Sequence, residues 1–189
     1  MQAPSFLERL PIARAAWSFA DDRHGNQRRA SDEAPFMAHP QEVAALLEEA
    51  GATDELVAAG VLHDTVERTP TTLGEIDDRF GSGVADLVGA VTEDPGIRSY
   101  SRRKAALREQ AVHAGEPAAA LFAADKVSKV REYREQLGRV ADGGAPPRPR
   151  RLSHYTASLL DLERVIPSHP LVTELRIELE QLTPVPVAH

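Results

Sequence analysis

The chain has 189 residues, no cysteine and a formal net charge of −7 at pH 7. This length suits one domain with its own core, and the absence of cysteine excludes disulfides and thiolate metal sites. The negative charge argues against general nucleic-acid binding, which requires phosphates to be neutralised. With no apolar run long enough to span a membrane and no signal peptide, we expect a cytoplasmic protein that binds neither nucleic acid nor membrane. Any metal site must use His, Asp and Glu.

Helical periodicity runs through almost the whole chain, and no segment of useful length alternates as a strand does. Thr53 is the expected N-cap of one helix, and Thr72 with Glu75 forms a capping box for the next. We therefore expect an all-α fold, a bundle of about eight helices. The pattern predicts helices over 11–22, 40–50, 54–67, 72–80, 83–94, 98–114, 117–138, 152–166 and 170–182.

The segment ADGGAPPRPR, residues 141–150, is the clearest break in this pattern. Its Gly-Gly, Pro-Pro and Arg-Pro steps do not continue a helix, so it predicts an exposed loop. The loop divides the chain into a main domain over 1–140 and a C-terminal helical pair over 151–189 that packs on the same domain. For that pair we expect packing or contacts in a homodimer.

The helix predicted over 54–67 ends in three ionisable side chains. His63 and Asp64 follow the apolar run VAAGVL, and at 100° per residue Glu67 lies between them in a sector about 100° wide. Because the preceding residues are apolar on nearly all sides, we expect the helix to be buried and its carboxylates to need a partner or a metal. The alternative is that the helix reaches the surface at His63 and leaves all three in solvent.

His39 stands before Pro40 at the expected N-cap of its helix, where histidine is a poor cap. The residue before a proline is held extended, which would fix the direction of this imidazole. His169 precedes Pro170 in the same way, but no other potential ligands cluster near it, so we expect a structural role there. His39 is therefore the histidine whose position needs a functional explanation.

Asp125 lies on a mostly apolar face of its predicted helix, with Leu121 one turn before it. An aspartate on such a face fits a metal ligand, and the alternative is an i, i+4 ion pair with Lys129. Two basic clusters, over 21–29 and 99–108, are expected to be mainly solvated surface.

The order His39, His63–Asp64 and Asp125, each on a separate helix, resembles the HD superfamily of metal-dependent phosphohydrolases. The similarity is closest to the branch that hydrolyses guanosine tetraphosphate and pentaphosphate, (p)ppGpp. It covers roughly residues 16–137. The stretches that carry it are HGNQRR, PFMAHPQEVAALLEEAG, AAGVLHDTVERTPTTLGEIDDRFGSGVADLVGAVTE and AADKVSKVRE.

The resemblance implies an all-helical fold and one divalent metal, usually manganese in this branch, while iron or zinc would suit the same ligand types. It implies that the metal is held by His39, His63, Asp64 and Asp125. Glu67 would orient or deprotonate the attacking water, and we place Asp64 with it in the catalytic set. The implied reaction releases pyrophosphate from the 3′ position of the nucleotide.

For the anionic nucleotide, the resemblance implies that Arg29 lines the pocket, and guanidinium suits phosphate. We add Arg68, Lys126 and Lys129 as expected substrate-binding residues. Two of these depart from the branch: its Glu-Asp pair is here Glu67–Arg68, and its Asn four residues after the last aspartate is here Lys129.

Three alternatives follow from these departures. Arg68 and Lys129 bind a polyphosphate more tightly, or they neutralise Asp64 and Asp125 in place of the metal, or they point outward and change little. We expect a retained metal site with altered or reduced catalysis. The alternatives to this enzyme are a hydrolase of a different nucleotide, a catalytically impaired sensor that binds a nucleotide or partner, and a purely structural helical domain.

Overall fold

The computed structural model describes residues 1–29, 32–140 and 146–182. Across these ranges the regular structure is helical, and the only β-type pairing found there is an isolated bridge between Arg28 and Pro35. The all-α prediction is therefore confirmed. In the same part of the chain, no helix has both the length and the apolar character needed to cross a membrane.

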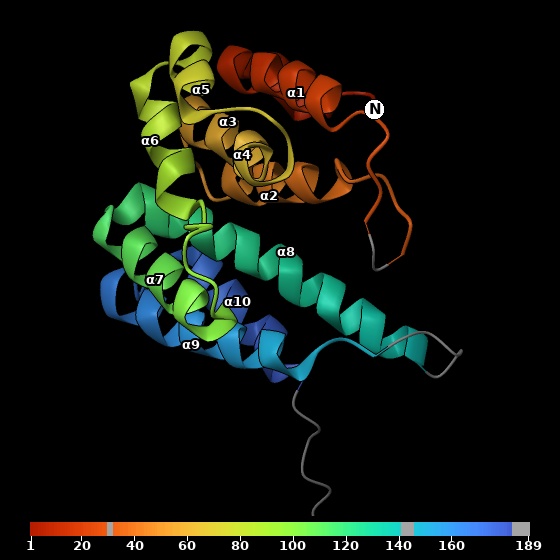
Figure 1. The fold of residues 1–189 in the computed structure, drawn as a ribbon, viewed down its shortest axis with the longest axis vertical. Helices are drawn as coiled ribbons and strands as arrows, with labels where there is room; N and C mark the ends of the chain where they lie inside the picture. Colours follow the sequence, from red (N-terminus) through yellow and green to blue (C-terminus); the bar gives the residue numbers. More distant parts are fainter. Residues whose placement is uncertain (30–31, 141–145, 183–189) are drawn as a thin grey trace, which may run out of the picture.

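Two groups of helices lie on either side of α8 (Glu116–Val140) (Figure 1). Helix α8 contacts α2, α3 and α6 of the first group and α7, α9 and α10 of the second. The first group consists of the 3₁₀ helix η1 (Ser5–Arg9), α1 (Pro11–His24), α2 (Ala38–Glu49), α3 (Asp54–Leu62), α4 (Thr65–Arg68), α5 (Leu73–Phe80) and α6 (Ser82–Val91). The second consists of α7 (Tyr100–His113), α9 (Pro149–Val165) and α10 (Pro170–Glu180).

Helix α3 is the central helix of the first group, because every residue from Leu56 to Leu62 is buried. The Thr53 hydroxyl accepts a hydrogen bond from the Leu56 amide at 3.3 Å, which confirms the predicted N-cap. Thr72 caps α5 in the same way, accepting from the Glu75 amide at 3.2 Å. These caps fix where the helices around the site begin.

The prediction of one continuous helix over 54–67 is wrong, because the helix is interrupted at His63 and Asp64. The His63 ring nitrogen Nδ1 lies 2.7 Å from the carbonyl oxygen of Gly60. In an unbroken α-helix that carbonyl would accept from the amide of Asp64, four residues on. The imidazole takes this acceptor, so α3 ends and α4 begins after a short turn.

The expected position of His39 is also wrong. Met37 is the N-cap of α2, so His39 lies in the first helical turn and is not extended. Pro40 is tolerated there because first-turn amides have no partner within the helix. His169, in contrast, is the N-cap of α10, and its Nδ1 accepts from the Leu171 amide at 3.2 Å.

The loop predicted over 141–150 ends earlier than expected. Residues 141–145 lie outside the described part of the chain, 146–148 have no regular structure, and α9 begins at Pro149, a residue favoured at the first helical position. Helix α9 packs against α7 and α8, and α10 packs against α8 and α9. Residues 183–189 of the predicted C-terminal pair also lie outside the described part. The division into domains stays a prediction.

Gly60 marks the close contact of α3 with α2. A Cβ atom added there would lie 2.6 Å from Leu47 Cδ1 and 3.5 Å from Val43 Cγ1. Because Leu47 is fully buried and must repack, we expect Gly60→Ala to lower the free energy of unfolding by about 1–2 kcal/mol in urea denaturation. The control is Gly138→Ala in α8, where the added Cβ would meet no atom within 4 Å beyond its chain neighbours and the backbone of its own helix. There we expect stabilisation by about 0.5–1 kcal/mol. Equal effects at both positions would contradict the close contact.

Candidate metal centre and cavity

A cavity of about 400 Å³ is lined by residues from both helix groups and from α8. All nine residues singled out in the sequence line it, although they come from segments far apart in the chain. They are Arg29, His39, His63, Asp64, Glu67, Arg68, Asp125, Lys126 and Lys129.

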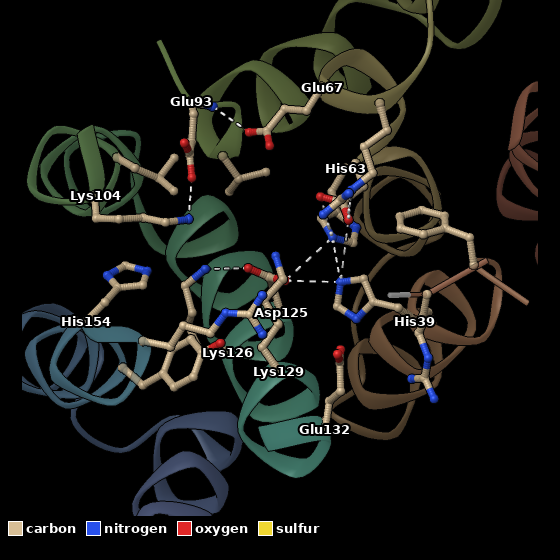
Figure 2. A pocket seen from close by; sticks show the side chains of 18 of the residues that line it. His39, His63, Glu67, Glu93, Lys104, Asp125, Lys126, Lys129, Glu132 and His154 are labelled. Carbon is tan, nitrogen blue, oxygen red and sulfur yellow. Dashed lines mark hydrogen bonds and ion pairs between the residues drawn. The ribbon is translucent and has the colours of Figure 1, made fainter. Parts of the chain in front are cut away.

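Three of these side chains converge on one point. The Nε2 atoms of His39 and His63 are 3.1 Å apart. Asp125 Oδ1 lies 3.2 Å from the first and 3.6 Å from the second, and Figure 2 shows the three together at the surface of α8. His63 is 3 % and Asp64 is 4 % exposed. The alternative that these two residues are simply solvated is therefore wrong.

Hydrogen bonds decide which ring nitrogen of each histidine carries the proton. His63 Nδ1 donates to the Gly60 carbonyl, because a carbonyl only accepts. Ser128 Oγ donates to Glu42 Oε2 at 2.7 Å, so its oxygen accepts from His39 Nδ1 at 2.8 Å. In the neutral rings, both Nε2 lone pairs therefore face each other and a carboxylate oxygen.

Such a set of donor atoms requires a cation. A proton on His63 Nε2 can satisfy the contact between the two rings. Burial lowers the pKa of His63, but Asp64 and Asp125 more than offset this effect, so the pKa of His63 lies above its ordinary value. Burial lowers the pKa of His39, so this ring stays neutral. A divalent ion would satisfy both nitrogens and the carboxylate at once, with the second ring nitrogen of each histidine held by a hydrogen bond, as is usual for metal ligands. The residues present therefore fit a metal.

Asp64 lies at the edge of this group. Its oxygens are 3.6 Å from His63 Nε2 and 3.8 Å from His39 Nε2, and in the described chain the ligand atoms that all lie within 4.8 Å of one another belong to His39, His63 and Asp125. Asp64 Oδ2 is 3.2 Å from Arg68 Nε. Burial raises the pKa of Asp64, but the surrounding cations, above all Lys129, hold it far below its ordinary value.

Asp125 is neutralised by two lysines of its own helix. Its Oδ1 is 2.7 Å from Lys129 Nζ, and its Oδ2 pairs with Lys126. The i, i+4 pair with Lys129, named above as the alternative to a metal ligand, is therefore present. Burial lowers the pKa of Lys126 to about 8, although Asp125 favours its charged form. Since Arg68 and Lys129 both pair with the aspartates, the alternative that they point outward is wrong.

Glu67 is exposed, and its Oε1 accepts a hydrogen bond from the backbone amide of Glu93 at 2.7 Å. Figure 2 shows its carboxylate directed toward Glu93. Because the helix is interrupted at His63 and Asp64, the helical angles that placed Glu67 between those two residues do not apply. Arg29 is held by Asp32, with Nε to Oδ1 at 3.1 Å.

Several cavity residues were missed in the sequence. Lys104 lies in a basic cluster that was expected to be mainly solvated surface, but it lines the cavity and pairs with Glu93. Helix α9 brings more residues into the same wall, and burial together with Lys126 lowers the pKa of His154 to about 2. No sequence feature named above pointed to Arg151, His154 and Tyr155 of α9. The missed residues are Arg28, Phe36, Val91, Glu93, Tyr100, Lys104, Leu107, Glu132, Gln136, Arg151, His154 and Tyr155.

The HD domain family model matches residues 16–136 of the chain. The chain belongs to this family. Among the relatives of this HD domain protein is the guanosine-3′,5′-bis(diphosphate) 3′-pyrophosphohydrolase MESH1 of Mus musculus, 42% identical over 120 residues, which are 62% of this chain and 66% of that one. The enzyme of the same name from Xenopus tropicalis is 38% identical over 63% of this chain and 68% of its own. The Aquifex aeolicus guanosine-3′,5′-bis(diphosphate) 3′-pyrophosphohydrolase is 44% identical, but the match spans only 12% of that protein.

Two solved structures share the fold of this HD domain protein. One, described as a metazoan ortholog of SpoT that hydrolyses ppGpp, has a TM-score of 0.76 and 24% identity over 96% of this chain and 98% of the other. A structure from Listeria monocytogenes EGD-e has a TM-score of 0.66 and 32% identity over 76% of this chain and 97% of the other. The first likeness extends through α9 and α10, so the C-terminal helical pair is part of the shared architecture.

Proposed function

We propose that this HD domain protein is a metal-dependent phosphohydrolase that releases pyrophosphate from the 3′ position of (p)ppGpp. The observation that carries the proposal is the convergence of His39 Nε2, His63 Nε2 and Asp125 Oδ1 inside a cavity with cationic walls. The names of the relatives that are about 40% identical support this choice of nucleotide. The cavity, about 400 Å³, falls within the usual range for small-molecule sites.

His39, His63, Asp64 and Asp125 would hold the ion, and their nitrogen and oxygen donors suit manganese, iron or zinc. We favour manganese. When bound, the ion would polarise a phosphoryl oxygen and lower the pKa of a bound water.

The other residues act on the water and on the substrate. Glu67, held by the amide of Glu93, would accept the proton of the attacking water. Arg29, Arg68, Lys126 and Lys129 would bind the phosphate groups, which carry several negative charges.

A second candidate function, a nucleotide sensor, is supported by the ion pairs that two of the proposed metal ligands form. Because Arg68 pairs with Asp64 and Lys129 with Asp125, the protein could bind a nucleotide without hydrolysing it and act as a sensor. A hydrolase of a different nucleotide would use the same residues. Purified protein with Mn²⁺ and ppGpp separates these candidates: we expect stoichiometric release of pyrophosphate and GDP. Binding of ppGpp with no release would support the sensor, and release only from another nucleotide would change the substrate.

We expect Glu67→Ala to lower kcat for pyrophosphate release by about 10²-fold, because the water loses its proton acceptor. The matched control is Glu109→Ala, an exposed acid of α7 that does not line the cavity, which should retain full activity. If Glu67→Ala and Glu109→Ala have equal rates, Glu67 is not the base.

The remaining features predicted from the sequence are part of the same proposal. They are a cytoplasmic location, a small anionic nucleotide as the partner in place of nucleic acid or membrane, a homodimer, and a main domain over 1–140 followed by the loop and the C-terminal helical pair. The packing of α9 and α10 on α8 supports the last of these.

A further inference from the structure

Lys129 and the candidate metal share one oxygen atom. Asp125 Oδ1 is the carboxylate atom that faces the two imidazoles, at 3.2 Å and 3.6 Å, and Lys129 Nζ lies 2.7 Å from that same oxygen. Lys126 pairs with the other oxygen, Oδ2. An ammonium group and a divalent ion on Oδ1 would repel each other strongly at this separation. Lys129, and not Lys126, therefore competes with the metal.

Lys129 is also the lysine that is able to move. Its side chain is 26% exposed and lines the open cavity, whereas Lys126 is 1% exposed and lies 4.1 Å from the centre of the Phe122 ring. The lysine side chain has a flexible stem of four carbons and a terminal charge that is well hydrated. A rotation of Lys129 away from Asp125 would place its ammonium group in the cavity.

The local charge then favours an anion. Two carboxylates, Asp64 and Asp125, pair with three cationic side chains, Arg68, Lys126 and Lys129. A divalent ion added to a group that already has an excess of positive charge needs further negative charge nearby, and phosphate groups supply it. Metal binding and anion binding should therefore assist each other, by the same factor in both directions.

We propose that Lys129 is an exchangeable counterion: it neutralises Asp125 when no metal is bound, and it moves into the cavity to bind a phosphate group when the metal takes its place. The metal and a phosphate-bearing ligand consequently bind cooperatively. This inference rests on the proposed metal site and names how that site is regulated.

The test is the affinity for Mn²⁺, measured from the EPR signal of the free ion, with and without inorganic phosphate. For the unmodified protein we expect phosphate to strengthen Mn²⁺ binding by about fivefold or more. Lys129→Gln should bind Mn²⁺ about tenfold more tightly than the unmodified protein without phosphate, and phosphate should change its affinity by less than about twofold.

The matched control is Lys104→Gln, which removes one positive charge from the same cavity but from a lysine that pairs with Glu93. Its Mn²⁺ affinity should change by less than about threefold. An unchanged Mn²⁺ affinity in Lys129→Gln, an equal gain in Lys104→Gln, or the absence of Mn²⁺ binding in every variant would overturn the proposal. The outcome does not depend on hydrolysis. If the Mn²⁺ affinities change as expected but no pyrophosphate is released, the proposed function alone is refuted. If pyrophosphate is released but Lys129→Gln leaves the Mn²⁺ affinity unchanged, this inference alone is refuted.

Discussion

Replacing His63 by Gln should lower kcat/KM for ppGpp hydrolysis by about 10³-fold or more and weaken Mn²⁺ binding in parallel. His63 Nε2 lies 3.1 Å from His39 Nε2 and 3.6 Å from Asp125 Oδ1, and an amide side chain does not supply an equivalent nitrogen lone pair. Glutamine is polar and similar in size, so the buried site stays filled. Pyrophosphate release at saturating Mn²⁺ and the stoichiometry of bound metal are the measurements.

The control for this variant is His113→Gln. His113 is exposed at the end of α7, and its Nδ1 forms a hydrogen bond with the Glu109 carbonyl of the same helix at 2.8 Å. This variant should keep both activity and bound metal. Circular dichroism of His63→Gln should show unchanged helix content. If folded His63→Gln retains half or more of the activity, the histidine does not hold the metal.

Asp125→Ala should lower the free energy of unfolding by about 3–5 kcal/mol in the presence of EDTA, because a buried charge loses its partner. Lys126 is 1% exposed and pairs with Asp125 Oδ2. With its pKa already lowered to about 8 by burial, an unpaired Lys126 must lose its proton or draw water into the core. Urea denaturation of the metal-free protein measures the loss.

A second substitution separates the buried charge from the lost volume. In Asp125→Ala/Lys126→Met the buried ammonium group is removed, and Lys129, whose side chain is 26% exposed, can turn to solvent, so the double variant should recover at least half of the lost stability. Asp86→Ala, at an exposed position of α6, should change stability by less than about 0.5 kcal/mol. A double variant less stable than Asp125→Ala would show that the ion pair is not what holds Lys126 in the core.

The helices were predictable because their signals are local. Apolar spacing, Thr53, Thr72 and the Gly and Pro residues at helix ends act within a few residues, and the structure agrees with them. The helix break was not predictable in this way, since it depends on the rotamer that directs His63 Nδ1 to the Gly60 carbonyl. Helix propensity describes the backbone preference of each residue and does not include a side-chain donor that competes for a backbone carbonyl.

The candidate site could be predicted only where residue type and order carry information. His63 and Asp125 were identifiable because ionisable groups beside or on apolar faces need a partner, and His39 was identifiable from its place before Pro40. The hydrogen bonds that support His39 from behind could not be predicted, because they join residues 86 to 89 positions apart in the chain. They connect Glu42 with Ser128, Ser128 with His39, and Arg131 with Glu42. Such pairs become neighbours only through tertiary packing.

The same hydrogen bonds give α10, the second helix of the C-terminal pair, a role that the sequence did not suggest. Arg131 of α8 contacts Glu42 at 3.1 Å and Glu178 of α10 at 2.7 Å. Glu42 in turn accepts from Ser128, which holds the ring of His39. Helix α10 is therefore connected to a proposed metal ligand through a continuous set of hydrogen bonds, and it supports the orientation of that ring.

The most direct test of the central claim is anomalous diffraction at the manganese edge from crystals grown with saturating Mn²⁺. We predict a single strong peak bonded to Nε2 of His39, Nε2 of His63 and the carboxylates of Asp64 and Asp125, with Lys129 displaced from Asp125. Crystals without a peak at this position, in which Lys129 still contacts Asp125 Oδ1 and the two imidazoles remain in contact, would contradict the metal centre and the hydrolase built on it.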